Sequence, residues 1–177
     1  MQSTSLKASS LLGAQFIREL ESEVRATREC LAEVPMDKAD WKPHEKSMPF
    51  GRLAGLVASM PSWVSLIVDQ DELDLTPPPG QGRFQPPKTE QLVSAHDEHI
   101  AKGRTSLSNT NDDYLLTTKW NLKAGGQVVL SDPRHIVLRD TLNHLAHHRG
   151  QLTVYLRLLN QPVPAVYGPS ADDQRFL

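Results

Sequence analysis

Cysteine, long apolar runs and clustered basic residues are all scarce in this 177-residue chain. Cys30 is the only cysteine, which excludes a disulfide within the chain and fits a reducing compartment. No apolar run approaches the roughly 20 residues of a membrane-spanning helix, and Met1–Ser10 lacks the pattern of a signal peptide. Lysine and arginine are scattered, and the net charge is −2. We therefore expect a cytoplasmic protein with no nucleic-acid and no membrane partner.

The chain is long enough for one domain with a substantial core, and we expect a single domain over residues 1–177. Cys30 lies near the end of a helical pattern and has no histidine beside it in the sequence. A structural role for its thiol is therefore favoured over a nucleophilic one.

Apolar residues recur at helical spacing in four stretches, each bounded by helix-start or helix-stop signals. The stretches are Ser9–Glu33, about Met48–Asp71, a helix that opens at Thr89, and a helix from Asp132-Pro133 to about Asn160. Thr89 and Asp132 are predicted as N-caps. Pro61 lies inside the second pattern and should kink that helix.

Two segments between these helices read differently. Thr76–Pro87 is rich in proline and glycine, which is typical of a stiff loop. Leu115–Leu130 surrounds Gly125-Gly126 and predicts either a short irregular hairpin or an extended crossover. The predicted fold is all-α: a four-helix bundle with a long proline-rich loop and a short insert before the last helix.

The last predicted helix carries three histidines within five residues. At about 100° per residue, His148 falls about 40° from His144, inside the apolar arc. His144 lies at the edge of that arc, and His147 lies outside it. His144 and His148 therefore share a face directed toward the interior, where two imidazoles at i and i+4 can reach one metal ion. The alternative is a pair of hydrogen-bonded core histidines.

A fourth histidine falls on an inward face of the third helix. His96 lies between Leu92 and Ile100 in the middle of the apolar stripe. It is either a hydrogen-bonded core residue or a further inward ligand.

Four segments together resemble a known family. They are Asn143–Leu152, Pro162–Asp172, Lys42–Ser47 and Met60–Trp63, and the resemblance extends over nearly the whole chain. The sequence is similar to the DinB/YfiT-like family of metalloenzymes. The resemblance implies a four-helix bundle, often dimeric, in which three histidines hold a divalent metal ion. Two of these histidines match His144 and His148.

The third family ligand lies in a pattern close to Leu-Ala-x-His-Val-Ala, and this chain departs from the family there. The matching segment is Leu53–Ala58, which places Leu56 at the ligand position. A leucine cannot coordinate, so the site is lost, persists weakly, or gains another ligand. His96 is the first candidate by its facing, and His44 and Glu45 of the connector are the others.

The surroundings of the histidine pair suggest supporting roles. Gln151 and Thr141 are candidates to orient the imidazoles. Arg149 is expected to pair with a carboxylate for structural reasons. His147 is expected on the surface, with a subunit contact as the alternative.

Two functions from different classes follow. The first is a metal-dependent hydrolase or thiol S-transferase that acts on an unidentified small molecule, with zinc or nickel as the expected ion and no catalytic residue assigned. The second is a metal-free small-molecule-binding or dimeric interaction module, which Leu56 favours because the third ligand is missing. A homodimer is expected in either case.

Overall fold

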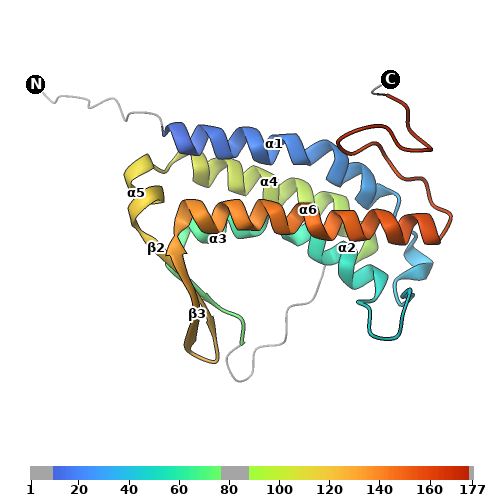
Figure 1. Ribbon diagram of the computed structural model, residues 1–177, viewed down its shortest axis with the longest axis horizontal. Helices are drawn as coiled ribbons and strands as arrows, with labels where there is room; N and C mark the ends of the chain where they lie inside the picture. Colours follow the sequence, from blue (N-terminus) through green and yellow to red (C-terminus); the bar gives the residue numbers. More distant parts are fainter. Residues whose placement is uncertain (1–9, 77–87, 176–177) are drawn as a thin grey trace, which may run out of the picture.

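The computed structural model describes residues 10–76 and 88–175. This part of the chain is mostly helical, with a small sheet at one end (Figure 1). The helices are α1 (Leu11–Ala32), α2 (Phe50–Ser59), α3 (Ser62–Asp69), α4 (Leu92–Ser108), α5 (Asp112–Thr117) and α6 (Arg134–Leu158), with short 3-10 turns η1 (Met36–Lys38) and η2 (Thr89–Gln91). The strands are β1 (Glu72–Asp74), β2 (Lys119–Ala124) and β3 (Gln127–Pro133).

Four long helical segments lie side by side. Helix α1 packs against α4 and α6, and the consecutive helices α2 and α3 pack against the same two helices. In Figure 1, α1 and α6 run in one direction, whereas α2–α3 and α4 run in the other. Because α3 and α4 run in the same direction, the end of α3 and the start of α4 lie at opposite ends of the helical layer.

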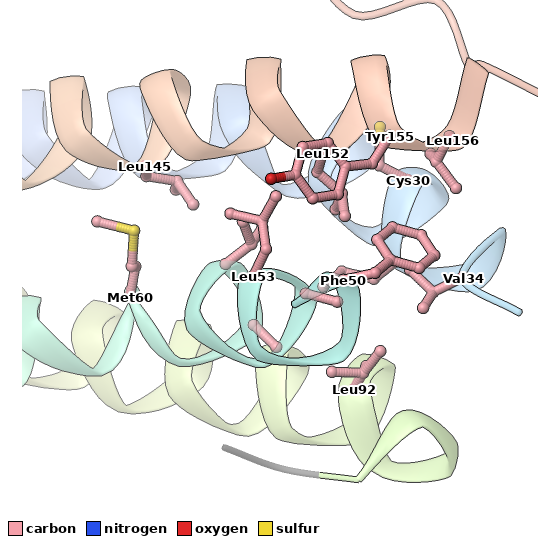
Figure 2. Packing of buried hydrophobic residues seen from close by; sticks show 14 residues of the cluster. Cys30, Val34, Phe50, Leu53, Met60, Leu92, Leu145, Leu152, Tyr155 and Leu156 are labelled. Carbon is pink, nitrogen blue, oxygen red and sulfur yellow. The ribbon is translucent and has the colours of Figure 1, made fainter. Parts of the chain in front are cut away.

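Pro61 divides the second helical segment, as its sequence predicts. Helices α2 and α3 meet at an angle of 45°, because proline removes a backbone donor from the helical ladder. On either side of the bend, α2 and α3 pack into different clusters of buried residues. Helix α2 contributes Phe50 and Leu53 to a core cluster with Leu145 and Tyr155 of α6 (Figure 2). Helix α3 contributes to a second cluster through residues that include Ile67.

The small sheet shows that the all-α prediction was wrong in part. Its strand order is β1-β2-β3, with β1 parallel to β2 and β2 antiparallel to β3. The hairpin was one of the two alternatives predicted for Leu115–Leu130. Strand β1 was not predicted, because three residues are too few to show an alternating pattern.

The hairpin turn and β1 hold each other in place. Gly125 and Gly126 both have positive φ angles, 59° and 78°, as the tightest hairpin turns require. Their backbone N–H groups donate to the carboxylate of Asp74, at 3.1 and 2.7 Å. Asp74 thereby couples the end of β1 to the turn between β2 and β3.

Neither predicted N-cap is confirmed. Helix α4 begins after η2, which contains Thr89, and Gln91 at the cap position makes no side-chain cap bond. Helix α6 begins at Arg134, because Asp132 and Pro133 belong to β3 and pair with β2. Asp132 therefore lies in a paired strand and not at the N-terminus of the helix.

A buried cation joins α1, α6 and the C-terminal segment. The Arg149 side chain is 1% exposed, and its guanidinium pairs with Glu23 Oε2 at 2.5 Å. It also donates to Thr27 Oγ1 at 3.0 Å and to Tyr167 OH at 2.7 Å. Arg149 therefore has the structural carboxylate partner that the sequence predicts.

No single helix among the described residues has the length and apolar character to cross a membrane. Among the same residues, the bent pair α2 and α3 together has that length and composition.

Two helical glycines make a matched pair for testing the packing of α1 on α4. A Cβ at Gly13 would lie 2.6 Å from the backbone oxygen of Leu107, whereas a Cβ at Gly150 would meet nothing within 4 Å. We expect Gly13→Ala to lower the free energy of unfolding by about 1–3 kcal/mol through overpacking. Gly150→Ala should raise it by about 0.5–1 kcal/mol through helix propensity. Urea unfolding of both variants checks this, and equal effects would contradict the close helix contact.

Candidate metal centre

His144 and His148 come together on α6 as their spacing predicts. Their Nε2 atoms are 2.9 Å apart, and the ring centroids are 4.6 Å apart. The Nδ1 atom of His148 is 2.7 Å from Oε1 of Gln151, one turn further along the helix. The Nε2 atoms of the two imidazoles thus point toward each other. The ring of His148 is also fixed on its other side by the contact between Nδ1 and Gln151.

The pair lies at the margin of the interior and not within it. His148 is half-buried and His144 is exposed, so the predicted inward direction is wrong for His144. Its ring makes an edge contact with Trp63 of α3, at 6.1 Å between centroids. Partial burial lowers the pKa of His144, and His148 and His147 lower it further. These shifts favour the neutral imidazole, which is the form that binds metal.

The other residues predicted near the pair take different roles. His147 is exposed as predicted, with its ring 5.0 Å from that of His148. The Thr141 hydroxyl donates its hydrogen bond to the Val137 carbonyl at 2.9 Å and not to either imidazole. Trp63 belongs to a segment whose sequence resembles the family, but its position beside His144 was not predicted. Its contact crosses between helices, so helical spacing alone does not reveal it.

The spacing of the two imidazoles fits two positions on a metal ion. At Zn–N distances of about 2.0–2.1 Å, tetrahedral geometry separates two ligand nitrogens by about 3.3 Å. The observed 2.9 Å is a hydrogen-bond distance, so the rings must open by a few tenths of an ångström to admit an ion. Small rotations of two partly exposed side chains achieve this without moving α6.

A third protein ligand is missing from this part of the chain. Leu56 is half-buried on α2 and packs against the core cluster of Figure 2. Within residues 10–76 and 88–175, no three histidine, cysteine, aspartate or glutamate side chains are grouped to hold a metal ion. His96 is therefore not brought to the pair. His44 and Glu45 are exposed in the connector before α2, where His44 Nδ1 accepts from the Lys46 N–H at 3.2 Å.

His96 is instead a core histidine with an incomplete set of hydrogen bonds. Its side chain is 0% exposed, its Nδ1 atom is 3.3 Å from Asp97 Oδ1, and its Nε2 atom has no partner. Burial lowers the pKa of His96, although Asp97 opposes the shift. Asp97 is also paired with Arg28 of α1. A proton on His96 would therefore be poorly compensated.

Cys30 is fully buried among apolar side chains (Figure 2). Burial raises the pKa of its thiol to about 11. The thiol is then protonated near neutral pH, and a protonated, buried thiol is a poor nucleophile. This agrees with the structural role predicted for Cys30.

Comparison with known proteins places the chain among DinB-like proteins. The DinB family profile matches residues 1–175. The uncharacterized protein YrdA of Bacillus subtilis (strain 168) is 25% identical over 165 residues, which cover 89% of this chain and 89% of YrdA.

Two crystal structures of DinB-like proteins share the fold. The protein from Bacillus cereus ATCC 10987 has a TM-score of 0.66 at 22% identity, covering 87% of this chain and 97% of its own. The protein from Bacillus subtilis has a TM-score of 0.63 at 19% identity, covering 91% of this chain and 99% of its own. At these identities the likeness establishes the fold alone.

His96 is buried, and only one of its ring nitrogens has a hydrogen-bond partner. This predicts that the stability of the fold is sensitive to acid. The pKa of His96 is lower in the folded chain than the ordinary value of about 6.5, so the unfolded chain binds the proton more readily. Stability should therefore fall as the pH falls below about 6.5, by up to about 1.4 kcal/mol per pH unit from this group. Urea unfolding between pH 7 and 5 measures the slope.

His96→Leu should make that slope shallower, because it removes the buried titrating group. His147→Ala, which alters an exposed histidine of α6, should keep the wild-type slope. An unchanged slope in His96→Leu would show that the acid sensitivity comes from other groups.

Proposed function

Because the chain belongs to the DinB family, we propose that it is a metal-dependent enzyme in which His144 and His148 hold one divalent ion. Zinc or nickel suits two imidazole ligands, and water or a substrate group would complete the coordination. We also propose that the four long helical segments form the four-helix bundle of this family, and that the protein acts in the cytoplasm as a homodimer.

The observation that carries this proposal is the convergence of two Nε2 atoms at 2.9 Å. The imidazoles come from one helix, so their relative position depends on local geometry and not on a distant loop. The hydrogen bond to Gln151 is of the kind that supports metal-binding histidines from behind. When bound, such an ion acts as a Lewis acid that lowers the pKa of a coordinated water or thiol.

The residues of this chain would then bind and shape the site. Trp63 closes one side of His144, which restricts the directions from which a small molecule can approach. Leu56 supplies an apolar side chain in place of a ligand, so at least two coordination positions are left for water or substrate. A hydrolase or a thiol S-transferase is consistent with such an open site, and we propose these two reaction classes.

One observation favours a second candidate. Leu56 stands at the family's ligand position, and no ligand group of three is found among the described residues. A chain that has given up the metal would keep the helical framework as a small-molecule-binding or dimeric interaction module. In that case His144 and His148 serve as hydrogen-bonding groups on the rim of a ligand site.

Metal content separates the two candidates. We expect protein purified without a histidine tag to bind about one zinc ion per chain when zinc is in excess. Leu56→His should bind zinc more tightly by adding a third imidazole, and His144→Ala should lose the ion. Elemental mass spectrometry after dialysis gives the stoichiometry of each variant.

The alternative outcome is equally clear. A wild-type protein that stays empty in excess zinc and in excess nickel, beside a Leu56→His variant that binds zinc, would reject the metal-dependent enzyme. It would leave the metal-free module as the function to pursue.

A further inference from the structure

We propose that Gln151 is a positioning residue that sets the tautomers of both histidines, so that His148 is ready to bind metal and His144 is not. The hydrogen-bonded chain runs from Gln151 through His148 to His144. Its consequence for metal binding rests on the function proposed above, whereas the tautomers themselves do not.

The first step is the bond between Gln151 and His148. The amide oxygen Oε1 is 2.7 Å from Nδ1 of His148. An amide oxygen can only accept a hydrogen bond, so Nδ1 must carry the proton. A neutral imidazole has one protonated nitrogen, so Nε2 of His148 is left with a free lone pair.

The second step is the contact between the two rings. The Nε2 atoms of His148 and His144 are 2.9 Å apart, a distance that requires one of them to donate. Since Nε2 of His148 holds the lone pair, Nε2 of His144 carries the proton. His144 is then the Nε2–H tautomer and His148 is the Nδ1–H tautomer. The two rings are chemically unequal although they occupy equivalent positions in the sequence pattern.

This inequality gives the two ligands an order. His148 presents a lone pair at the nitrogen that would bind the ion, and its ring is already fixed by Gln151. His144 presents a proton at the corresponding nitrogen and must first move it to Nδ1, for which no hydrogen-bond partner is found among the described residues. His148 would therefore be the first of the two ligands, and coordination by His144 would require the ring–ring hydrogen bond to break.

The direction of the chain depends on the orientation of one amide. If the Gln151 side chain were reversed, its NH₂ group would donate to Nδ1 of His148 and both tautomers would exchange. His148 would then be blocked and His144 would be ready. The two arrangements make opposite predictions for each nitrogen, so they can be distinguished directly.

Nitrogen NMR of the metal-free protein tests the tautomers. Histidine labelled with ¹⁵N, observed at a pH at which both rings are neutral, should show His148 protonated at Nδ1 and His144 protonated at Nε2. Gln151→Ala should shift the His148 population away from Nδ1–H. Gln127→Ala, which alters an exposed glutamine of β3, should leave both signals unchanged. The reverse tautomers in the wild type, or no change in Gln151→Ala, would overturn the proposal.

Zinc affinity tests the consequence. Loss of a hydrogen-bond partner behind a metal-binding histidine lowers affinity by about 10–100-fold, and we expect this loss in Gln151→Ala. Gln127→Ala should bind as the wild type does, and Gln151→Glu should retain affinity because a carboxylate also accepts from Nδ1–H. Equal zinc affinity of wild type and Gln151→Ala would overturn the positioning role.

A wild-type protein that binds no zinc would reject the proposed enzyme without deciding the role of Gln151. The NMR result still decides the tautomers in that case, because it uses the metal-free protein. The affinity comparison is then made in a Leu56→His background, with and without Gln151→Ala, where the same fold-change is expected.

Discussion

The buried guanidinium of Arg149 is the constraint on which the arrangement of α1, α6 and the C-terminal segment depends. An unpaired cation in the interior would cost several kcal/mol, so Arg149 requires its partners to be in place. Glu23 and Thr27 come from α1, and Tyr167 comes from the segment after α6. Satisfying one charge therefore fixes three parts of the chain at once. A hydrophobic residue at the same position would tolerate many more relative positions of the two helices.

The same turn of α6 serves packing on one side and chemistry on the other. Arg149 faces α1, whereas its neighbour His148 faces His144 and the side of the molecule where Trp63 lies. Rotation of α6 about its axis would expose the guanidinium, so the direction of the histidine pair is set by a contact that does not belong to the site. The positions of His144 and His148 are thereby coupled to the core and not to a loop.

The candidate site combines a well-placed pair with a missing third group. Two imidazoles at hydrogen-bond distance would supply two of the four ligands of the proposed metal site, and Leu56 would leave a third position without a protein ligand. The site is also shallow, because His144 is exposed and His148 only half-buried. Such a site leaves much of the coordination of any ion to solvent or substrate. The chemistry then depends on what binds as much as on the protein.

Periodicity and proline placement in the sequence determined the helices, the bend at Pro61, the hairpin alternative, the pairing of Arg149 with a carboxylate and the approach of His144 to His148. The helices, the bend, the hairpin and the histidine pair depend on neighbours within a few residues along the chain. For Arg149 the sequence indicated only that a carboxylate would pair with it, and the tertiary structure decided that the partner is Glu23 of α1. The sequence motifs identified the family that the profile confirms. Only the tertiary structure decided the strand β1, the start of α6 after β3, the isolation of His96 from the pair and the contact of Trp63 with His144. These features depend on how separate helices pack and how strands pair, and there the tertiary contacts outweigh local preference.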